Sequence, residues 1–368
     1  MRPSQSNVTH GFARVNDLRF HYAEVGEGPL LLLLHGFPES WWSWRHQLET
    51  LAQAGHRVIA LDQRGYNETE QRGPYDIDTL ASDACEIIRA LGEQQADVVG
   101  HDWGGAVAWH LAAMRPACVR KLAVLGCPHP SQLVAALRKS RRQLARSWYI
   151  LLFQLPWLPE QTLSRFGHSL LPTIYRRLAT DRSHLAADEI EPFVDGLRKP
   201  GAAKAMIDWY RAAFRAAVRD RGRVPSYPVI EADTLLIWGE NDFGHGYDDL
   251  VPGTERYAPK LRVEIIERCG HFMQAERPDR VNALLTEFLG SARAVSQPEM
   301  RFSVVLAAVG DNKISVIREI RAITGLNLTA VKDLVDAVPK TIVEGATRQE
   351  AEQIRDKLTG AGAVVEIG

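Results

Sequence analysis

The run Gly100-His101-Asp102-Trp103-Gly104-Gly105 limits the fold of this chain more than any other segment. The apolar residues 96–99 before it predict a buried strand, and residues 106–111 after it predict a helix. Glycines on both sides of Asp102 predict a tight turn between the strand and the helix. In such a strand–turn–helix the turn residue projects from a strained backbone at the helix N-terminus, where a nucleophile is exposed.

The side chain of Asp102 decides which chemistry this turn can support. A carboxylate attacks saturated carbon well and becomes an ester in doing so. The motif therefore indicates the opening of epoxides or the displacement of halide rather than the cleavage of esters. The structural alternative is a tight turn in which Asp102 only caps the following helix.

Composition argues against several other classes of protein. The 44 Lys and Arg residues nearly cancel the 45 Asp and Glu residues, so no overall charge favours nucleic acid or an anionic membrane. Residues 1–7 lack the apolar run of a secretory signal, and residues 30–34 are too few to span a bilayer. Neither a zinc site nor a disulfide framework is predicted by the scattered cysteines Cys85, Cys118, Cys127 and Cys269. We therefore expect a cytoplasmic protein with no metal, membrane or nucleic acid partner.

The chain of 368 residues is too long for one ordinary core, so more than one domain is expected. A hairpin pattern spans residues 12–25. Short, uniformly apolar strand patterns then alternate with helical ones, and these strands fall at residues 30–34, 57–61, 97–99, 122–125, 234–238 and 262–266. Uniformly apolar strands between helices predict an α/β fold with a mostly parallel sheet covered on both faces.

This alternation stops between residues 133 and 221, where only helical pattern is found. We interpret the stretch as an all-helical cap inserted over the carboxyl edge of the sheet, where open α/β sheets bind ligands. The small, polar residues after residue 290 predict a linker, and strand and helix patterns start afresh beyond it. The expected organisation is a core of residues 1–130 and 226–290, a cap of residues 131–225, a linker of residues 291–300 and a small α+β domain of residues 301–368.

A nucleophilic carboxylate needs an oxyanion hole, a base for the second step and a group that orients the base. The backbone N–H groups of Phe37, after the first core strand, and of Trp103, after the nucleophile, are the expected oxyanion hole. Asp102 is ionised at neutral pH and attacks without a base. A base is required only for the water that cleaves the ester.

Two residues follow the last two strand patterns of the core in the order that such a site needs. His271 is the expected base, and Asp242 is the expected acid that orients its imidazole. The loop after Asp242 is rich in polar residues and glycine. Asp248 or Asp249 would take over the orienting role if Asp242 did not fill it.

Four segments together resemble the epoxide hydrolase branch of the α/β-hydrolases, and the resemblance covers residues 10–290. They are His35-Gly36-Phe37-Pro38-Glu39-Ser40-Trp41, Asp62-Gln63-Arg64-Gly65-Tyr66, His101-Asp102-Trp103-Gly104-Gly105 and Gly270-His271. The resemblance implies an α/β-hydrolase fold with an inserted helical cap and Asp102 in the nucleophile elbow. It implies hydrolysis of an epoxide to a vicinal diol through an ester on Asp102, with no metal or organic cofactor. Asn67 departs from the family pattern, which usually has Gly there.

Epoxide hydrolases of this kind supply two cap tyrosines, whose phenols protonate or hydrogen-bond the departing alkoxide. The matching segments are residues 147–154 and 207–211, so the resemblance implies Tyr149 and Tyr210 as the donors. Tyr175 is a third candidate without support from a motif. The aromatic and aliphatic content of the cap indicates a small apolar epoxide as substrate, and His35, Trp148 and Trp209 are the residues expected to bind it.

Two other functions remain open at this stage. A haloalkane dehalogenase uses the same nucleophile but holds halide with Trp103 and a second Trp or Asn. Phe37 stands where those enzymes often have Asn, which weakens this interpretation, and the remaining indole donors are Trp148, Trp157 and Trp209. The other function is that of an interaction protein with a vestigial hydrolase body.

Residues 301–368 resemble the C-terminal domain of the bacterial ribosomal stalk protein. The resemblance is carried by Asn312-Lys313-Ile314, Val316-Ile317-Arg318, Thr324-Gly325-Leu326 and Val331-Lys332-Asp333-Leu334-Val335. In the stalk protein basic and apolar residues on two helices recruit protein partners. The resemblance therefore implies a protein-interaction module, with the partner-binding residues Lys313, Ile314, Ile317, Arg318, Arg321, Leu328 and Lys332. The structural alternative is a set of exposed helix charges around a small core.

Overall fold

The computed structural model describes residues 7–183, 185–242, 246–290, 302–310, 312–346 and 348–367. The chain divides into two compact units between residues 293 and 294, and each unit is described by itself. The expected linker of residues 291–300 and part of the loop after Asp242, residues 243–245, lie outside the described residues.

Among the described residues, the first unit contains an eight-stranded sheet with the order β1-β2-β4-β3-β5-β6-β7-β8. β1 and β2 form a hairpin, β2 pairs antiparallel with β4, and the remaining pairs are parallel. The predicted mostly parallel sheet is confirmed. Its strands are β1 (Thr9–Val15), β2 (Leu18–Val25), β3 (Leu30–Leu34), β4 (Arg57–Leu61), β5 (Ala96–His101), β6 (Val119–Leu125), β7 (Asp233–Gly239) and β8 (Leu261–Ile266).

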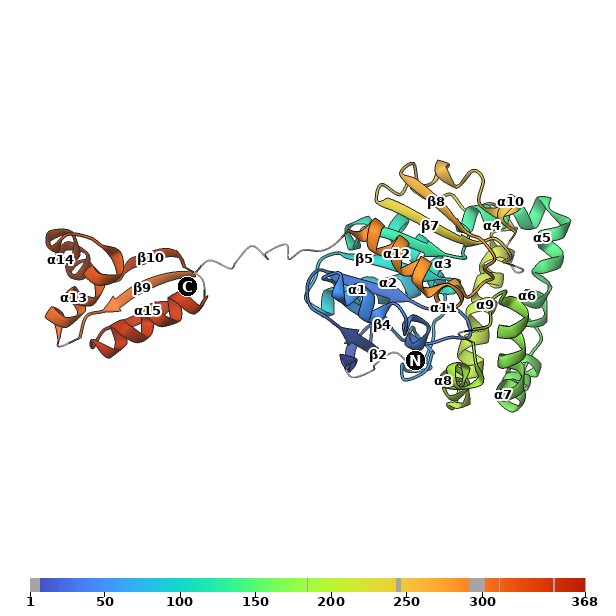
Figure 1. The fold of residues 1–368 in the computed structure, drawn as a ribbon, viewed down its shortest axis with the longest axis horizontal. Helices are drawn as coiled ribbons and strands as arrows, with labels where there is room; N and C mark the ends of the chain where they lie inside the picture. The colour runs from blue at the N-terminus through green and yellow to red at the C-terminus, as the bar shows by residue number, and fades with distance from the viewer. Residues whose placement is uncertain are drawn as a thin grey trace. The chain divides into compact units, whose positions relative to one another are not determined.

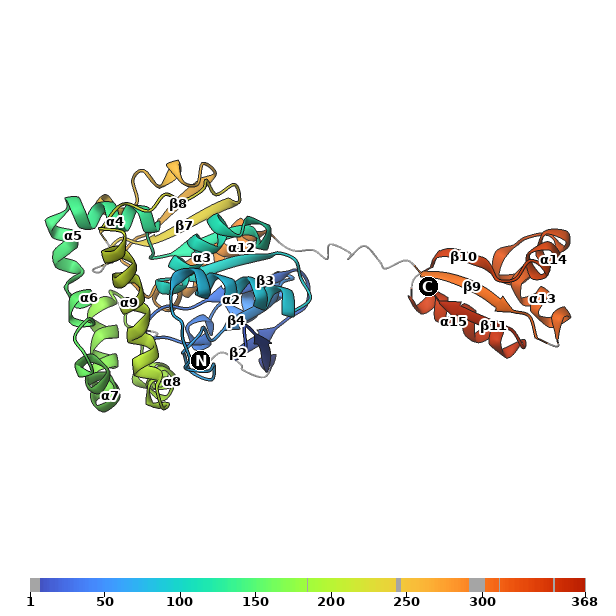
Figure 2. The ribbon, with the colours of Figure 1, turned by 180° about the vertical axis from the view of Figure 1, so that it is seen from behind.

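Helices cover both faces of this sheet, which explains why strand β3 is a run of five leucines. Leu30, Leu32 and Leu34 belong to one apolar core, and Leu31 and Leu33 belong to the other. Helices α1 (Leu48–Gln53) and α12 (Pro278–Leu289) lie over one face, and α2 (Ile77–Ala90) and α3 (Trp103–Met114) over the opposite one (Figures 1 and 2). Shorter elements complete the unit: η2 (Trp41–Trp44), η3 (Pro116–Cys118), η4 (Thr254–Arg256), α10 (Tyr247–Leu250) and α11 (Met273–Glu276).

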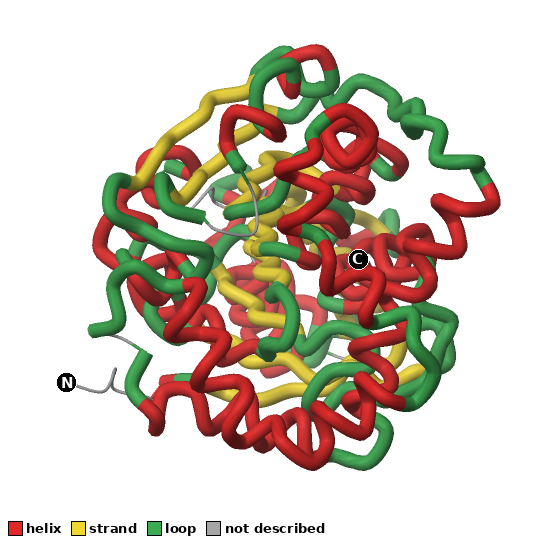
Figure 3. Tube along the Cα trace, turned by 90° about the vertical axis from the view of Figure 1, so that its right-hand side faces the viewer, coloured by secondary structure: helices red, strands yellow, loops and turns green. Residues whose placement is uncertain are grey.

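Among the residues that the structure describes between β6 and β7, where the sequence predicts a helical cap, there are six helices. They are α4 (Pro130–Lys139), α5 (Arg141–Arg146), α6 (Trp148–Leu152), α7 (Leu158–Leu178), α8 (Ala187–Arg198) and α9 (Ala202–Arg219). They lie together at one end of the sheet (Figures 1 and 3). α9 buries a stripe at helical spacing, which includes Ala202, Met206 and Trp209. No helix of the described residues is long and apolar enough to cross a membrane.

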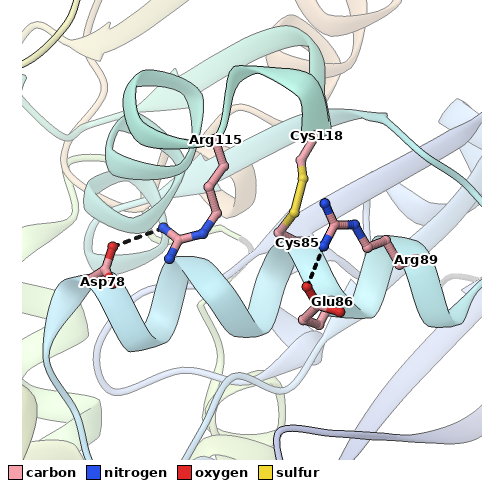
Figure 4. The surroundings of a disulfide bond; sticks show 6 residues. All are labelled: Asp78, Cys85, Glu86, Arg89, Arg115 and Cys118. Carbon is pink, nitrogen blue, oxygen red and sulfur yellow. Dashed lines mark hydrogen bonds and ion pairs between the residues drawn. A yellow bond between two sulfur atoms is a disulfide. The ribbon is translucent and has the colours of Figure 1, made fainter.

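A disulfide joins two elements on one side of the sheet, which corrects the expectation that the cysteines form none. Cys85 of α2 is bonded to Cys118 of η3, between an ion pair of Asp78 with Arg115 and another of Glu86 with Arg89 (Figure 4). The cysteine count and spacing gave no signal for this pair, because only the packing of α2 on η3 brings the two residues together. The Cα atoms lie 5.8 Å apart.

We expect reduction of the Cys85–Cys118 bond to destabilise the first unit. The bond closes a loop across a sequence separation of 33 residues, and closing a loop of this size in the unfolded chain stabilises a protein by about 3–4 kcal/mol. Urea unfolding with and without reductant measures the difference. Cys85→Ala should have the same effect without reductant, and equal stability of the reduced and oxidised chain would contradict the prediction.

The second unit is the small α+β domain that the sequence predicts. Its antiparallel sheet has the order β10-β9-β11, with strands β9 (Phe302–Ala308), β10 (Lys340–Ala346) and β11 (Val364–Ile367). Its helices are α13 (Lys313–Thr324), α14 (Leu328–Asp336) and α15 (Arg348–Gly360). Apolar residues from the helices and the sheet meet in one core, which includes Leu306, Val316, Ile320, Val331 and Leu358.

Candidate active site

Asp102 lies in a strained turn between β5 and α3. Its φ is 51° and its ψ is −119°, a conformation that a residue with a Cβ atom rarely adopts. Its side chain makes no capping hydrogen bond to α3; instead, its Oδ1 accepts the backbone N–H of Phe37 at 2.9 Å. The structure therefore does not support the alternative in which Asp102 only caps α3. Strain of this kind is found mainly at functional sites.

Two glycines allow this turn to form. A Cβ atom on Gly36 would lie 2.5 Å from the Cβ of Asp102, so only glycine lets the Phe37 loop approach the carboxylate. A Cβ on Gly104 would lie 2.1 Å from the carbonyl oxygen of Leu34, so glycine also lets α3 begin directly against β3. The N–H of Trp103, in the first turn of α3, has no partner within that helix. It and the Phe37 N–H are the two expected oxyanion-hole donors.

His271 stands beside Asp102 on the loop that follows β8. Its Nδ1 is 2.8 Å from Oδ2 of Asp242, which follows β7, and its Nε2 is 3.6 Å from Oδ2 of Asp102. The first distance is a hydrogen bond, and the second is longer than one. Asp249 instead accepts the hydroxyl of Ser140 in the cap. The structure thus brings together the three side chains that the sequence analysis selected as nucleophile, base and orienting acid.

Electrostatic interactions favour the ionised form of Asp102, which is the form that can attack a substrate. Burial alone would raise the pKa of Asp102, but the neighbouring His271 and the Phe37 N–H hold it below its ordinary value. Burial alone would lower the pKa of His271, but the carboxylates of Asp242 and Asp102 raise it well above its ordinary value. Each of the two groups therefore favours the charged form of the other in the free protein.

Tyr149 of α6 and Tyr210 of α9 face one another above this site. Their ring centroids are 5.9 Å apart, and the Tyr210 ring lies 5.2 Å from Phe37 and 5.0 Å from Trp103. Burial raises the pKa of both phenols, and the charge of Asp102 raises it further. Both phenols therefore carry a proton at neutral pH and are available as donors. Tyr175, the third candidate, is instead stacked on Phe272 at 4.1 Å.

The three residues expected to bind substrate have other surroundings. Both ring nitrogens of His35 meet the backbone, at the carbonyl of Gly36 and the N–H of Gln63, so His35 orders the loop before Phe37. Trp209 is fully buried, and its Nε1 donates to the carbonyl of Arg64. Trp148 is 61% exposed on the outside of the cap, so the structure does not bring it into the site.

A buried polar layer behind the site was not identified from the sequence. His101, next to the nucleophile, has its Nε2 at 2.9 Å from the carbonyl oxygen of His271 and its Nδ1 at 2.9 Å from the carboxylate of Glu39. The same Glu39 carboxylate accepts the N–H of Gly36. This layer links the Phe37 loop, the nucleophile turn and the His271 loop. Both residues stand inside the motifs quoted above, and this position was the available signal.

Glu276 is a second buried carboxylate that the sequence analysis missed. It accepts backbone N–H groups on both sides of His271, from Gly270 and Phe272. It also accepts two from residues just after α7, at 2.7 Å from Thr180 and 3.0 Å from Asp181. Glu276 therefore fixes the His271 loop to the cap. The described residues contain no cluster of His, Cys, Asp and Glu that could hold a metal ion.

The fold and this geometry define an α/β enzyme with a carboxylate in the nucleophile turn and its site beneath a helical cap. Residues 29–278 match the family described as the alpha/beta hydrolase fold, and residues 302–368 match the ribosomal protein L7/L12 C-terminal domain. The chain belongs to the α/β-hydrolase family. The resemblances predicted for both parts of the chain are confirmed.

Similar proteins carry the name epoxide hydrolase or the name of the superfamily. AB hydrolase superfamily protein YfhM of Bacillus subtilis is 37% identical over 284 residues, which cover 76% of this chain and 96% of that protein. Epoxide hydrolase 4 of Homo sapiens is 36% identical over 293 residues, which cover 76% of this chain and 79% of that protein. The crystal structure of Bacillus megaterium epoxide hydrolase with an inhibitor is 29% identical, has a TM-score of 0.69 and covers 76% of this chain and 99% of its own.

Proposed function

We propose that this protein hydrolyses apolar epoxides to vicinal diols through an ester on Asp102. The observation that carries the proposal is the ionised Asp102 in its strained turn, with His271 at 3.6 Å and two protonated phenols above it. A carboxylate nucleophile suits a saturated carbon. Phenol donors suit a leaving group that becomes an alkoxide. The names of the similar proteins point to the same reaction.

In the first step an oxygen of Asp102 attacks an epoxide carbon, and the bond from that carbon to the epoxide oxygen breaks. The electron pair goes to the oxygen, which takes a proton from Tyr149 or Tyr210. In the second step His271 removes a proton from water, and the hydroxide attacks the ester carbonyl. The N–H groups of Phe37 and Trp103 stabilise the resulting oxyanion, a contribution of about 3–4 kcal/mol in comparable sites.

Collapse of this intermediate releases the diol alkoxide, which takes the proton from His271. The carboxyl group left on Asp102 returns its proton to the phenolate. Protons and electrons then balance, and the sum of the steps is epoxide plus water to diol. Asp242 holds the imidazole by its hydrogen bond to Nδ1 throughout.

The geometry favours this reaction over halide displacement. A dehalogenase needs a second donor for halide besides Trp103, and the indole N–H of Trp209 is already bonded to the carbonyl of Arg64. Trp148 and Trp157 are 61% and 71% exposed on the outside of the cap. Incubation of the protein with aryl and alkyl epoxides, and with matched bromoalkanes, tests the choice. Diol formation without bromide release is the expected result, and bromide release without diol would assign a dehalogenase.

We expect the fall of turnover at low pH to arise from the second step alone, the cleavage of the ester. The pKa of His271 is raised by two carboxylates, and one of these charges is lost when Asp102 becomes an ester. The pKa of His271 therefore falls in the ester form, and the imidazole becomes neutral and able to act as a base. Below that pKa the imidazole is protonated, so ester cleavage slows while alkylation continues, because the pKa of Asp102 is low. We expect the fraction of ester in rapidly quenched reactions to rise as pH falls, and a constant fraction would contradict this.

We also propose that the second unit is a protein-interaction module. Ile314 of α13 is 83% exposed, and Leu328 at the start of α14 is 48% exposed. Arg318, Arg321 and Lys332 are exposed on the same two helices, Lys313 pairs with Asp336, and Ile317 is partly buried against the core. An exposed apolar residue among basic ones suits a partner with an apolar and acidic surface.

Charge reversal tests the module in the full chain. Lys313→Glu combined with Arg321→Glu should abolish capture of partner proteins by the immobilised chain. Lys340→Glu combined with Lys357→Glu places the same charge change on β10 and α15 and should leave capture intact. Retention of every partner by the first variant would remove the proposal.

A further inference from the structure

The outside of the cap carries a group of large apolar side chains that the reaction does not use. We call this group the apolar cap surface. Trp148 and Trp157 are its most exposed members, at 61% and 71%, although residues of this size are usually buried. Apolar surfaces of this kind mark sites of interaction. Its members are Trp148, Leu151, Leu152, Leu155, Trp157 and Leu158.

This surface has a fixed position above the active site. Arg211 of α9 donates to the carbonyl oxygens of Phe153 and Leu155, which holds the connection between α6 and α7 in place. The same short segment presents Tyr149 and Phe153 inward, where the Phe153 ring lies 5.6 Å from Phe37 and 4.8 Å from Tyr210. α6 thus carries Tyr149 on the side of the active site and the exposed Trp148, Leu151 and Leu152 on its outer side.

A cluster of positive charge precedes this surface in the chain. We call it the basic cluster, and it consists of Arg138, Lys139, Arg141, Arg142 and Arg146 on α4 and α5. No Asp or Glu occurs in the sequence between Asp102 and Glu160, and Glu160 is paired with Arg211. Asp249, which accepts the hydroxyl of Ser140, is a carboxylate from another part of the chain that reaches this region. The overall charge of the protein is near zero, so the composition gives no indication that basic residues are concentrated in this region.

We propose that the apolar cap surface and the basic cluster together bind the surface of an anionic lipid membrane. α5 and α6 follow one another along the outer edge of the cap (Figures 1 and 2), and we infer that both features can meet one plane. Exposed tryptophans favour the region between lipid headgroups and acyl chains. Lys and Arg beside them are attracted to anionic headgroups. Neither feature requires a helix that spans the bilayer.

Two other occupants fit this surface less well. A symmetric dimer through the cap would bring two copies of the basic cluster to one interface, where like charges repel. The second unit of the chain carries acidic residues, among them Asp333 and Asp336, as well as basic ones on its exposed helices, so it offers the basic cluster a mixed surface rather than an acidic one. An anionic membrane complements both the charge and the apolar side chains.

This inference deepens the proposed function and rests on it for the substrate class. Apolar epoxides partition into the hydrocarbon of a bilayer, because burial of apolar surface away from water is favourable. A cap that lies on the bilayer through the outer side of α6, with Tyr149 on the inner side of the same helix, would take its epoxide from the membrane rather than from water. Membrane binding itself does not require catalysis and is measured without substrate.

Sedimentation with lipid vesicles tests the proposal on the full chain. We expect binding to vesicles of phosphatidylcholine with about one third phosphatidylglycerol, and much weaker binding to phosphatidylcholine alone, because each basic residue contributes about 1 kcal/mol at an anionic surface. Arg141→Gln combined with Arg142→Gln should lower the partition coefficient about 30-fold. Leu151→Gln combined with Leu155→Gln should lower it at least about tenfold, since apolar area is then lost.

Matched control variants distinguish the loss of these particular side chains from a general effect of removing charge or apolar area. Arg176→Gln with Arg177→Gln removes the same charge from the other end of α7, and Val218→Gln removes an exposed apolar residue from α9. Both should bind vesicles as the unchanged chain does. All four variants should hydrolyse a water-soluble epoxide at the unchanged rate, so loss of vesicle binding is distinguished from loss of the proposed activity.

Other outcomes would overturn the proposal. Equal binding to neutral and anionic vesicles, or binding that the Arg141 and Arg142 changes leave intact, would show that the basic cluster plays no part. Absence of vesicle binding together with a dimer that Leu151→Gln dissociates would assign the apolar cap surface to a second copy of the chain.

Discussion

Asp102→Gly is expected to lower epoxide turnover by about 10⁴-fold or more, because removal of a covalent nucleophile leaves only binding and the oxyanion hole. The same variant should be more stable than Asp102→Ala. Both changes remove the carboxylate and its bond to Phe37, but only Gly adopts a φ of 51° without strain on a Cβ atom. The expected difference in the free energy of unfolding is about 1 kcal/mol.

This pair of variants separates catalysis from structure. Turnover on an aryl epoxide and urea unfolding should be measured on both chains. Equal loss of turnover with higher stability of the Gly variant would show that the backbone strain at Asp102 is retained for its function. Turnover that survives in either variant would mean that another group attacks the substrate. Lower stability of the Gly variant would contradict the strain argument.

Removal of the cap phenols is the second change with a large expected effect. Tyr149→Phe and Tyr210→Phe should each lower the rate of ester formation by about 10²-fold, the usual contribution of a general acid. The double variant should lose more than either single one, because one phenol can no longer replace the other. Ring contacts with Phe37, Trp103 and Phe153 are kept in Phe, so the site should stay packed.

Pre-steady-state quenching measures the rate of ester formation directly. Tyr227→Phe is the matched control, since its hydroxyl bonds to His110 outside the site. It should not change the rate. The rate of ester cleavage should also stay unchanged in the Tyr149 and Tyr210 variants, because that step depends on His271. A slower cleavage with an unchanged rate of ester formation would assign the tyrosines another role.

The sequence predicted much of the first unit because its signals are local or ordered along the chain. Five consecutive leucines in β3 indicated a strand buried on both faces, and the two apolar cores confirm it. Asp102, Asp242 and His271 each follow the carboxyl end of a strand of the parallel sheet, β5, β7 and β8, and this was enough to place them at one edge of the sheet. The three side chains lie close together because the carboxyl ends of parallel strands lie at the same edge of the sheet.

Other features depend on which way a side chain points, and the sequence does not contain that information locally. Trp148 and Tyr149 are adjacent, yet Trp148 points to the outside and Tyr149 toward the site. The Cys85–Cys118 bond depends on the packing of α2 against η3. The role of Glu276 can be recognised only from its hydrogen bonds with four backbone N–H groups, two of which belong to the cap.

The intact mass of His271→Gln after incubation with epoxides tests the central claim most directly. Without the imidazole the ester on Asp102 should form and persist, because alkylation needs no base and ester cleavage does. We expect an added mass equal to that of one whole epoxide, located on the peptide that contains Asp102 and absent in His271→Gln combined with Asp102→Gly. Persistence of turnover without an adduct, or an adduct on another residue, would contradict the account.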